Sequence, residues 1–146
     1  YSVEIQNYRL KINDLTAKHH IVASIDIEKG LPTIPADGMQ LREVVSILVV
    51  NAVQAMSPHG GGTLTVSARR ENGWAALRVS DTGPGMPASV LENLFTPFFT
   101  TKSRGLGLGL SISREIVKAH KGTIEVHSQP NQGATFVIKL PLGTHT

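Results

Sequence analysis

The sequence predicts an α+β fold, a two-layer sandwich in which helices cover one face of a mixed β-sheet. Three observations lead to this prediction. Segments with apolar residues at helical spacing lie between segments that alternate apolar and polar residues. Short turn sequences separate neighbouring strand segments, which predicts local strand pairing. The chain has 146 residues, the size of one ordinary domain, so we expect residues 1–146 to form a single domain with its own core.

The first part of the chain alternates between predicted helix and predicted strand. Residues 3–18 place apolar side chains at helical spacing, whereas residues 20–28 alternate in the manner of a strand with one buried face. Residues 31–35 contain prolines and form a rigid extended connector, because each proline disfavours helix in the residue before it. A second helix is predicted over residues 38–56, and it ends where Pro58 and a run of glycines follow.

The middle of the chain predicts a β-hairpin and a short helix. Strands at residues 63–70 and 74–81 are separated by a turn that contains Asn72-Gly73, a pair that suits a tight hairpin. Pro87 is a suitable first residue for a helix that ends at residue 94 or 95.

The last part of the chain predicts one more helix and a second pair of strands. The helix covers residues 109–120, with Gly122 as its C-terminal stop. Strands at residues 123–128 and 134–140 follow, and a turn at residues 129–133 separates them.

The composition excludes several classes of protein. Hydrophobic residues make up 40% of the chain and charged residues 17%, as in soluble globular proteins, and no apolar run approaches the roughly 18 residues of a membrane-spanning helix. The absence of cysteine excludes disulfides and thiolate metal sites. The net charge of +3 comes from scattered basic residues with few aromatics, so we expect no nucleic-acid partner. We expect a cytoplasmic domain, whether or not the full-length protein carries a membrane anchor.

A carboxylate stands at the end of the second strand of the predicted hairpin. Asp81 continues the apolar face of residues 75–79, so its side chain should point inward, where an ionised group needs polar partners. Gly83 and Gly85 let the backbone turn sharply and let a flat ligand come close. The motif indicates either a hydrogen-bond acceptor at the floor of a ligand pocket or a turn in which Asp81 caps its own backbone.

A second glycine cluster, residues 105–109, leads directly into the last predicted helix. Glycines before a helix expose backbone N–H groups next to the positive end of the helix dipole, which favours an anion. Lys102 and Arg104 add positive charge. The alternative is a flexible loop, and the dinucleotide-binding fingerprint is a poor match because no strand directly precedes the glycines.

A polar amide interrupts the apolar sequence of the helix predicted over residues 38–56. Asn51 has apolar neighbours on both sides, and a buried amide must be hydrogen-bonded or coordinate something. Its carbonyl oxygen suits Mg²⁺ that also bridges substrate phosphates. The alternative is an asparagine that a neighbouring backbone group satisfies.

Together these motifs resemble the catalytic ATP-binding domain of sensor histidine kinases, in the GHKL superfamily. The family carries five short motifs, the N, G1, F, G2 and terminal G boxes, and this chain matches their order and spacing. The N box corresponds to Asn51 with Ala52 and Ala55, and the G1 box to Asp81-x-Gly83-x-Gly85. The F box corresponds to Phe95-x-Pro97-Phe98-Phe99, the G2 box to Gly105-x-Gly107-x-Gly109, and the terminal G box to Gly133-Ala134-Thr135-Phe136. The resemblance covers about residues 20–140 and is specific, because chance seldom produces five short motifs in order. Residues 100–102 are similar to those of the nitrogen-regulatory subgroup.

The resemblance implies ATP and Mg²⁺ as ligands. Asp81 would accept a hydrogen bond from the adenine amino group, and Thr135 would support the same edge of the base. Residues 99–109 would form the ATP lid, and the F-box phenylalanines would pack at its base. The implied nucleotide-binding residues are Asp81, Gly83, Gly85, Lys102, Gly105, Leu106, Gly107, Leu108, Gly109 and Thr135. The implied catalytic residues are Asn51, which is also the metal ligand, and Lys102, which would contact the γ-phosphate.

One position departs from the family pattern. Family members often carry a second asparagine one helical turn before the metal ligand, and here that position is Ile47, which can neither bind Mg²⁺ nor orient water. Glu43, a further turn back, is either a partial substitute or a solvated surface residue.

The resemblance also implies partners. The family transfers the γ-phosphoryl group to a histidine on a separate helical dimerisation domain, and none of the chain's six histidines has the acidic neighbour typical of that acceptor. We therefore expect a catalytic domain that cannot phosphorylate itself, with residues 1–18 leading from a missing dimerisation domain. The full-length protein would be a homodimer that acts on a response regulator, and the isolated domain would be a monomer.

Two other functions remain open from the sequence. One is an ATPase like those of gyrase, mismatch-repair and heat-shock proteins, which place a glutamate base where this chain has Ile47. The other is a nucleotide-sensing or docking domain that has lost transfer chemistry.

Overall fold

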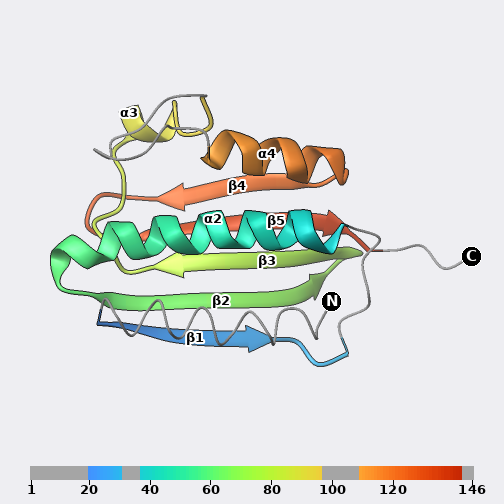
Figure 1. Cartoon of the computed structure of the whole chain (residues 1–146), viewed down its shortest axis with the longest axis horizontal. Helices are drawn as coiled ribbons and strands as arrows, with labels where there is room; N and C mark the ends of the chain where they lie inside the picture. Colours follow the sequence, from blue (N-terminus) through green and yellow to red (C-terminus); the bar gives the residue numbers. More distant parts are fainter. Residues whose placement is uncertain (1–19, 31–36, 97–108, 143–146) are drawn as a thin grey trace, which may run out of the picture.

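A computed structural model describes residues 20–30, 37–96 and 109–142, and it confirms the predicted two-layer α+β architecture. The elements are β1 (Ile21–Ile27), α2 (Gly38–Met56), the 3₁₀ turn η1 (Ser57–His59), β2 (Gly62–Glu71), β3 (Trp74–Asp81), α3 (Ala88–Leu91), α4 (Gly109–Ala119), β4 (Thr123–Ser128) and β5 (Ala134–Pro141). Figure 1 shows α2 and α4 lying over one face of the sheet, with α3 near one end. The predicted helix at residues 3–18 and the connector at residues 31–35 lie outside the described residues.

The sheet is mixed, and β3 lies at its centre. Its five strands follow the order β1-β2-β3-β5-β4, in which β1 and β2 are parallel and the other neighbours are antiparallel. Asn72 and Gly73 both have positive φ, at 50° and 83°, as the two central residues of a tight hairpin turn require. The central position of β3 places Asp81 between Leu64 of β2 and Ala134 of β5.

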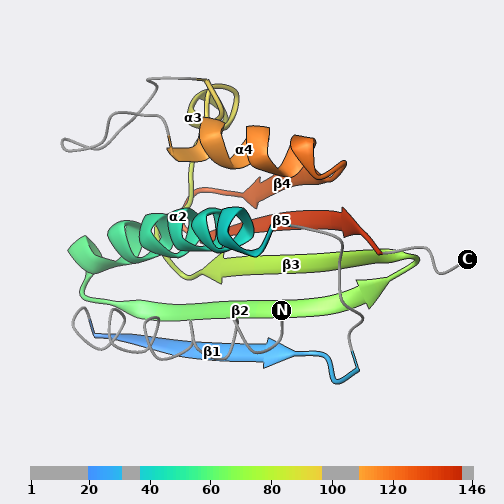
Figure 2. The same ribbon diagram turned by 45° about the vertical axis from the view of Figure 1, so that its right-hand side comes forward.

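The core lies between the sheet and the two long helices. Every second residue of the central strands faces α2 and α4, because successive strand side chains point to opposite faces. α2 packs against α4 as well as against β2 and β3, so one helix contacts both the sheet and the second helix (Figure 2). The fully buried side chains with the largest volume are Leu48, Met56, Leu64, Ile138, Val44, Val49, Val79 and Val117.

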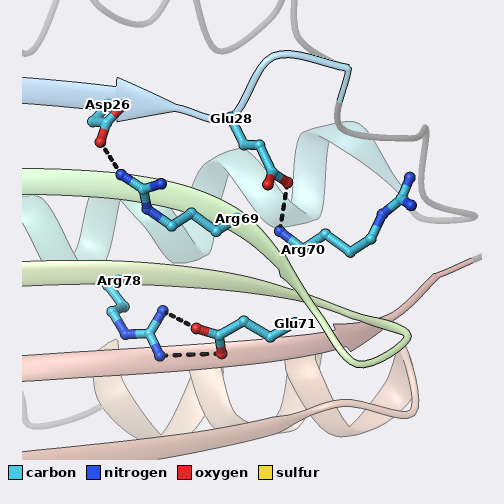
Figure 3. A network of polar contacts seen from close by, with 6 residues as sticks. All are labelled: Asp26, Glu28, Arg69, Arg70, Glu71 and Arg78. Atoms are coloured by element: carbon cyan, nitrogen blue, oxygen red, sulfur yellow. Dashed lines mark hydrogen bonds and ion pairs between the residues drawn. The ribbon is translucent and has the colours of Figure 1, made fainter.

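Polar contacts join β1, β2 and β3 on the part of the sheet towards the β2–β3 turn (Figure 3). Arg78 pairs with Glu71 at 2.9 Å, and this hydrogen-bonded pair lowers the pKa of the Glu71 carboxyl. Asp26 pairs with Arg69 in the same way across β1 and β2. Exposed pairs of this kind contribute little to stability because solvent screens them, so burial of the other face supplies most of it.

Two elements differ from the sequence-based prediction at their ends. α3 ends at Leu91, although the sequence predicts a helix to residue 94 or 95, and Pro87 is its N-cap without a side-chain hydrogen bond. At the end of α4 the left-handed residue is Lys121, with φ of 61°, whereas Gly122 was expected to stop the helix. Gly122 is required for another reason, because a Cβ there would overlap the backbone carbonyl of Lys139.

A histidine joins the two long helices at one end. Asp37 is the N-cap of α2, and its carboxylate accepts hydrogen bonds from the N–H groups of Met39 and Gln40. Its own backbone N–H donates to Nε2 of His120 at 3.0 Å, while Nδ1 of His120 lies 2.8 Å from the carbonyl of Ile116. The two bonds require the neutral ring with its proton on Nδ1.

Within the described residues no helix has the length and apolar character needed to cross a membrane.

We predict that His120→Ala lowers the free energy of unfolding by about 0.5–1.5 kcal/mol, because the exposed backbone N–H of Asp37 exchanges its protein acceptor for water. Chemical denaturation monitored by circular dichroism measures the change. His127→Ala is the matched control, since that side chain is 67% exposed and should matter by less than about 0.5 kcal/mol. Equal stability of the two variants would contradict the role of His120.

Candidate functional site

The centre of the candidate site is the carboxylate at the end of β3. Asp81 is half-buried on the helix-covered face, and its Oδ1 accepts a hydrogen bond from the N–H of Gly83 at 2.9 Å. Burial raises the pKa of Asp81, and backbone donors at Gly83 and Ala134 act against this shift. The inward orientation expected from the sequence is therefore present, together with the turn in which Asp81 caps its own backbone.

One face of α2 forms the wall beside this carboxylate. Ile47, Asn51 and Ala55 are spaced four residues apart and so lie on the same face of the helix. The Cβ of Ala55 lies 3.4 Å from the position that a Cβ would take at Gly83. The loop after Asp81 therefore packs against the C-terminal half of α2, and a Cβ at residue 83 would lie tightly against Oδ1 of Asp81, at 3.1 Å.

The start of α4 lies next to the same face of α2. Cγ2 of Ile47 is 3.2 Å from the position that a Cβ would take at Gly109, the first residue of α4. Asn51 lies one turn from Ile47 and one turn from Ala55, so it is placed between the start of α4 and the loop after Asp81. The structure thus places Gly83 and Gly109, which are far apart in the sequence, along one face of α2 that also carries Asn51.

Thr135 is not brought together with Asp81, and this expectation from the family resemblance is wrong. In the β3–β5 register Asp81 is opposite Ala134, whereas Thr135 is opposite Ser80. The Thr135 hydroxyl lies 2.9 Å from the Ser80 hydroxyl, on the other face of the sheet. A shift of one residue along a strand moves the side chain to the opposite face, which spacing between motifs does not reveal.

The loop at residues 82–87 is held against the turn between β4 and β5. Gly85 has φ of 71°, and a Cβ there would overlap the backbone carbonyl of Gln129. Gly133 has φ of 74°, and a Cβ there would overlap the backbone carbonyl of Asp81. Gly85 therefore allows contact with protein backbone, which differs from the expectation that it makes room for a ligand. Met86 donates its N–H to the Ser128 hydroxyl at 2.9 Å, a contact that no sequence motif indicated.

The F-box segment contacts α4 through an aromatic side chain. Phe95 is half-buried against the core, as expected of a packing residue. The guanidinium carbon of Arg114 on α4 lies 5.6 Å from the centre of the Phe95 ring, a cation–π distance. Sequence reasoning missed Arg114, which lies one helical turn after Leu110 at the middle of α4.

Several expected site residues cannot be placed. Lys102, Gly105, Leu106, Gly107 and Leu108 all lie outside the described residues, as do most of the residues assigned to the lid. Their roles stay predictions from the sequence.

The raised pKa of Asp81 leads to a pH-dependent prediction. The folded state holds the Asp81 proton more tightly than the unfolded state, so wild-type stability falls as the pH rises from the ordinary carboxyl range through the folded pKa. Asp81→Asn removes this dependence and keeps an oxygen that can accept from Gly83. We expect the variant to gain stability relative to wild type over that interval and to keep a constant advantage above it.

Urea denaturation between about pH 4 and pH 8 measures this difference. Asp26→Asn, at a carboxylate that pairs with Arg69 and is 57% exposed, controls for the loss of one negative charge. A difference between Asp81→Asn and wild type that shrinks as the pH rises would contradict the prediction.

Comparison with known proteins identifies the family of this arrangement. Residues 36–144 match the family described as histidine kinase-, DNA gyrase B-, and HSP90-like ATPase. The sensor histidine kinase ZraS of Escherichia coli (strain K12) is 43% identical over 112 residues, which cover 77% of this chain and 24% of ZraS. The C4-dicarboxylate transport sensor protein DctB of Rhizobium meliloti (strain 1021) is 46% identical over 114 residues, which cover 73% of this chain and 18% of DctB. This chain therefore spans a quarter or less of the length of these relatives.

Solved structures show the same fold. The nucleotide-free catalytic domain of histidine kinase ThkA superposes with a TM-score of 0.83 at 29% identity, covering 94% of this chain and 89% of that chain. Full-length ShkA in complex with AMPPNP superposes with a TM-score of 0.80 at 28% identity, covering 94% of this chain and 30% of that chain. The chain belongs to the histidine kinase-, DNA gyrase B- and HSP90-like ATPase family, and within it to the catalytic ATP-binding domains of sensor histidine kinases.

Proposed function

We propose that this domain binds ATP with Mg²⁺ between α2 and the start of α4 and transfers the γ-phosphoryl group to a histidine on a separate helical dimerisation domain. The single observation that carries the proposal is the half-buried Asp81 carboxylate, which lies at the end of the central strand beside Gly83. A similar protein, full-length ShkA, forms a complex with AMPPNP, which supports a nucleotide as the ligand of this family of domains.

At the adenine end, Asp81 supplies the hydrogen-bond acceptor. One carboxylate oxygen already accepts from Gly83, which leaves acceptor capacity for an exocyclic amino group. Thr135 is left out of this proposal, because its side chain belongs to the other face of the sheet. The methyl group of Ala134, the residue opposite Asp81, offers no hydrogen bond, so Asp81 is the main polar determinant at this edge of the base.

At the phosphate end, the start of α4 supplies a favourable environment for negative charge. α4 begins at Gly109 and has no acidic residue in its first turn, so the positive end of its dipole is uncompensated there. We propose that Gly105, Gly107 and Gly109 donate backbone N–H groups to the phosphates, that Leu106 and Leu108 belong to the same nucleotide-binding segment, and that Lys102 contacts the γ-phosphate.

The residues available for Mg²⁺ are fewer than in many family members. Asn51 offers a hard carbonyl oxygen on the face of α2 that lies between Gly83 and Gly109, which suits a metal that keeps several waters. When bound, Mg²⁺ would neutralise charge on the phosphates. Ile47 offers no oxygen, and its methyl group instead packs towards Gly109. We propose that Asn51 alone among these positions supplies a metal ligand from α2.

The chemistry asked of this domain is positioning. The bond between the γ-phosphorus and the bridging oxygen breaks, a bond forms to an imidazole nitrogen of the partner domain, and ADP leaves. The catalytic domain holds the base at Asp81 and the phosphates at the start of α4, so that the γ-phosphate is presented to the incoming histidine. No covalent intermediate on this chain is required.

The partners proposed for the whole protein follow from the relatives. The chain spans 24% of ZraS and 18% of DctB, so the acceptor histidine, the dimer and the sensing part would lie in other segments. We propose a homodimeric sensor kinase that passes the phosphoryl group to a response regulator, with this domain in the cytoplasm. The similarity of residues 100–102 to the nitrogen-regulatory subgroup stays a prediction.

The ATPase alternative is disfavoured by a specific side chain. Hydrolysis in the related ATPases needs a glutamate one turn before the asparagine, and Ile47 cannot act as a base or hold a water molecule. A nucleotide-sensing domain without transfer activity differs from the kinase only in the final step, so the phosphotransfer experiment below separates the two.

We predict that Asp81→Asn weakens Mg-ATP binding by about 100-fold, because the new amide directs a donor at the adenine amino group and removes an acceptor. Isothermal titration calorimetry measures the affinity, which we expect to be micromolar for wild type. Asp26→Asn serves as the charge-matched control and should bind like wild type. Unchanged affinity in Asp81→Asn would exclude this carboxylate from the site.

We predict that Asn51→Ala weakens the dependence of ATP binding on Mg²⁺ by removing the carbonyl oxygen that would hold the metal. Titration of ATP with Mg²⁺ and with excess chelator compares the two affinities. Gln54→Ala removes an exposed amide from the same helix and should leave the ratio of affinities as in wild type. An identical ratio in Asn51→Ala would argue against this ligand.

We predict that radiolabelled ATP leaves no label on this domain alone, and that label appears on histidine once the dimerisation domain of the full-length protein is added. Phosphate release from the isolated domain, followed over hours, should stay close to background. Steady phosphate release would favour the ATPase, and nucleotide binding without phosphohistidine would favour the sensing domain.

A further inference from the structure

The hydroxyl of Ser128, the last residue of β4, connects two segments of the nucleotide site. It accepts a hydrogen bond from the N–H of Met86 at 2.9 Å and donates one to the carbonyl of Gly133 at 2.9 Å. A serine hydroxyl has one proton, so the two bonds use it in complementary roles as acceptor and donor. Ser128 is half-buried, and its loss would leave two backbone groups without these partners.

The loop that Ser128 holds has no secondary structure of its own. It connects Asp81 with α3, and its two prolines, Pro84 and Pro87, have no N–H to donate. Backbone N–H groups hold the loop at both of its ends: Gly83 donates to Oδ1 of Asp81 at 2.9 Å, and Met86 donates to the Ser128 hydroxyl at 2.9 Å. Ser128 is therefore the anchor at the end of the loop remote from Asp81.

The second bond of Ser128 connects the same hydroxyl to Asp81. Gly133 accepts from Ser128, and its Cα packs so closely on Asp81 that a Cβ would overlap the Asp81 carbonyl. Asn131 also donates its N–H to the carbonyl of Pro84 at 2.5 Å. The turn between β4 and β5 thus fixes the path of the loop backbone. The Ser128 side chain connects this turn to Met86 at one end of the loop and, through Gly133, to Asp81 at the other end.

We infer that Ser128 is a positioning residue for nucleotide binding, whose hydroxyl holds the loop at residues 82–87 in the shape that keeps Asp81 oriented towards the base. The inference rests on the proposed binding of ATP at Asp81 and assigns a residue on β4 to that site. Ser128 acts through Met86 and Gly133, without contact to the ligand. The loop follows Asp81, the residue proposed to bind the adenine base. Loss of the Ser128 hydroxyl should therefore weaken the binding of ATP and of adenosine by the same factor.

The test compares Ser128→Ala with Ser128→Thr, which keeps a hydroxyl and suits a strand end. Calorimetry at 25 °C measures the affinities for Mg-ATP and adenosine, after circular dichroism shows that each variant is folded. We expect Ser128→Ala to bind both ligands about tenfold more weakly and Ser128→Thr to stay within about twofold of wild type. Ser24→Ala, an exposed serine on β1, should bind like wild type.

A purely structural role for Ser128 predicts a different result. Ser128→Ala would then have a lower melting temperature and an unchanged affinity in the folded state, and that result would overturn the inference. If Ser128→Ala does not fold, hydrogen exchange of wild type decides, because the Met86 amide must exchange slowly if the bond forms and rapid exchange overturns it. Failure of wild type to bind either ligand would overturn the proposed function itself, and this inference with it.

Discussion

The half-buried carboxylate of Asp81 imposes the constraint on which the rest of the site depends. A carboxylate in this position is costly unless backbone donors face it, and here the donors come from Gly83 and Ala134. The Gly83 donor belongs to the local turn that follows Asp81, whereas the Ala134 donor requires the start of β5 to pack beside the end of β3. The site is therefore a consequence of how these two segments pack at the end of the central strand.

α2 combines a structural and a functional face. Its buried residues, including Leu48, Val49 and Ala52, pack on the sheet and fix the position of the helix relative to β3. The adjacent face carries Ile47 and Asn51, so the position of the asparagine is set by the burial of its neighbours. The close packing of these neighbours fixes the backbone of α2 at Asn51 and therefore the place from which its side chain projects.

Much of the fold followed from local patterns. The bounds of α2, β3 and β4 agree with the prediction, because their apolar periodicity and their flanking turn residues are local properties of the chain. The errors lie where tertiary contacts decide. Pro87 does not begin the short helix as its first residue, and Gly122 is needed for the approach of the Lys139 backbone, which no local pattern reveals.

The sequence by itself determined the order of elements, the family resemblance and the inward orientation of Asp81, because alternation along one strand and spacing along one helix depend only on neighbouring residues. The tertiary structure alone decided which residues of different strands face one another. It placed Ala134, and not Thr135, opposite Asp81, and it brought Ser128 to the loop after β3. Strand register and loop packing arise from contacts between distant segments, and these contacts are not encoded in the spacing of motifs.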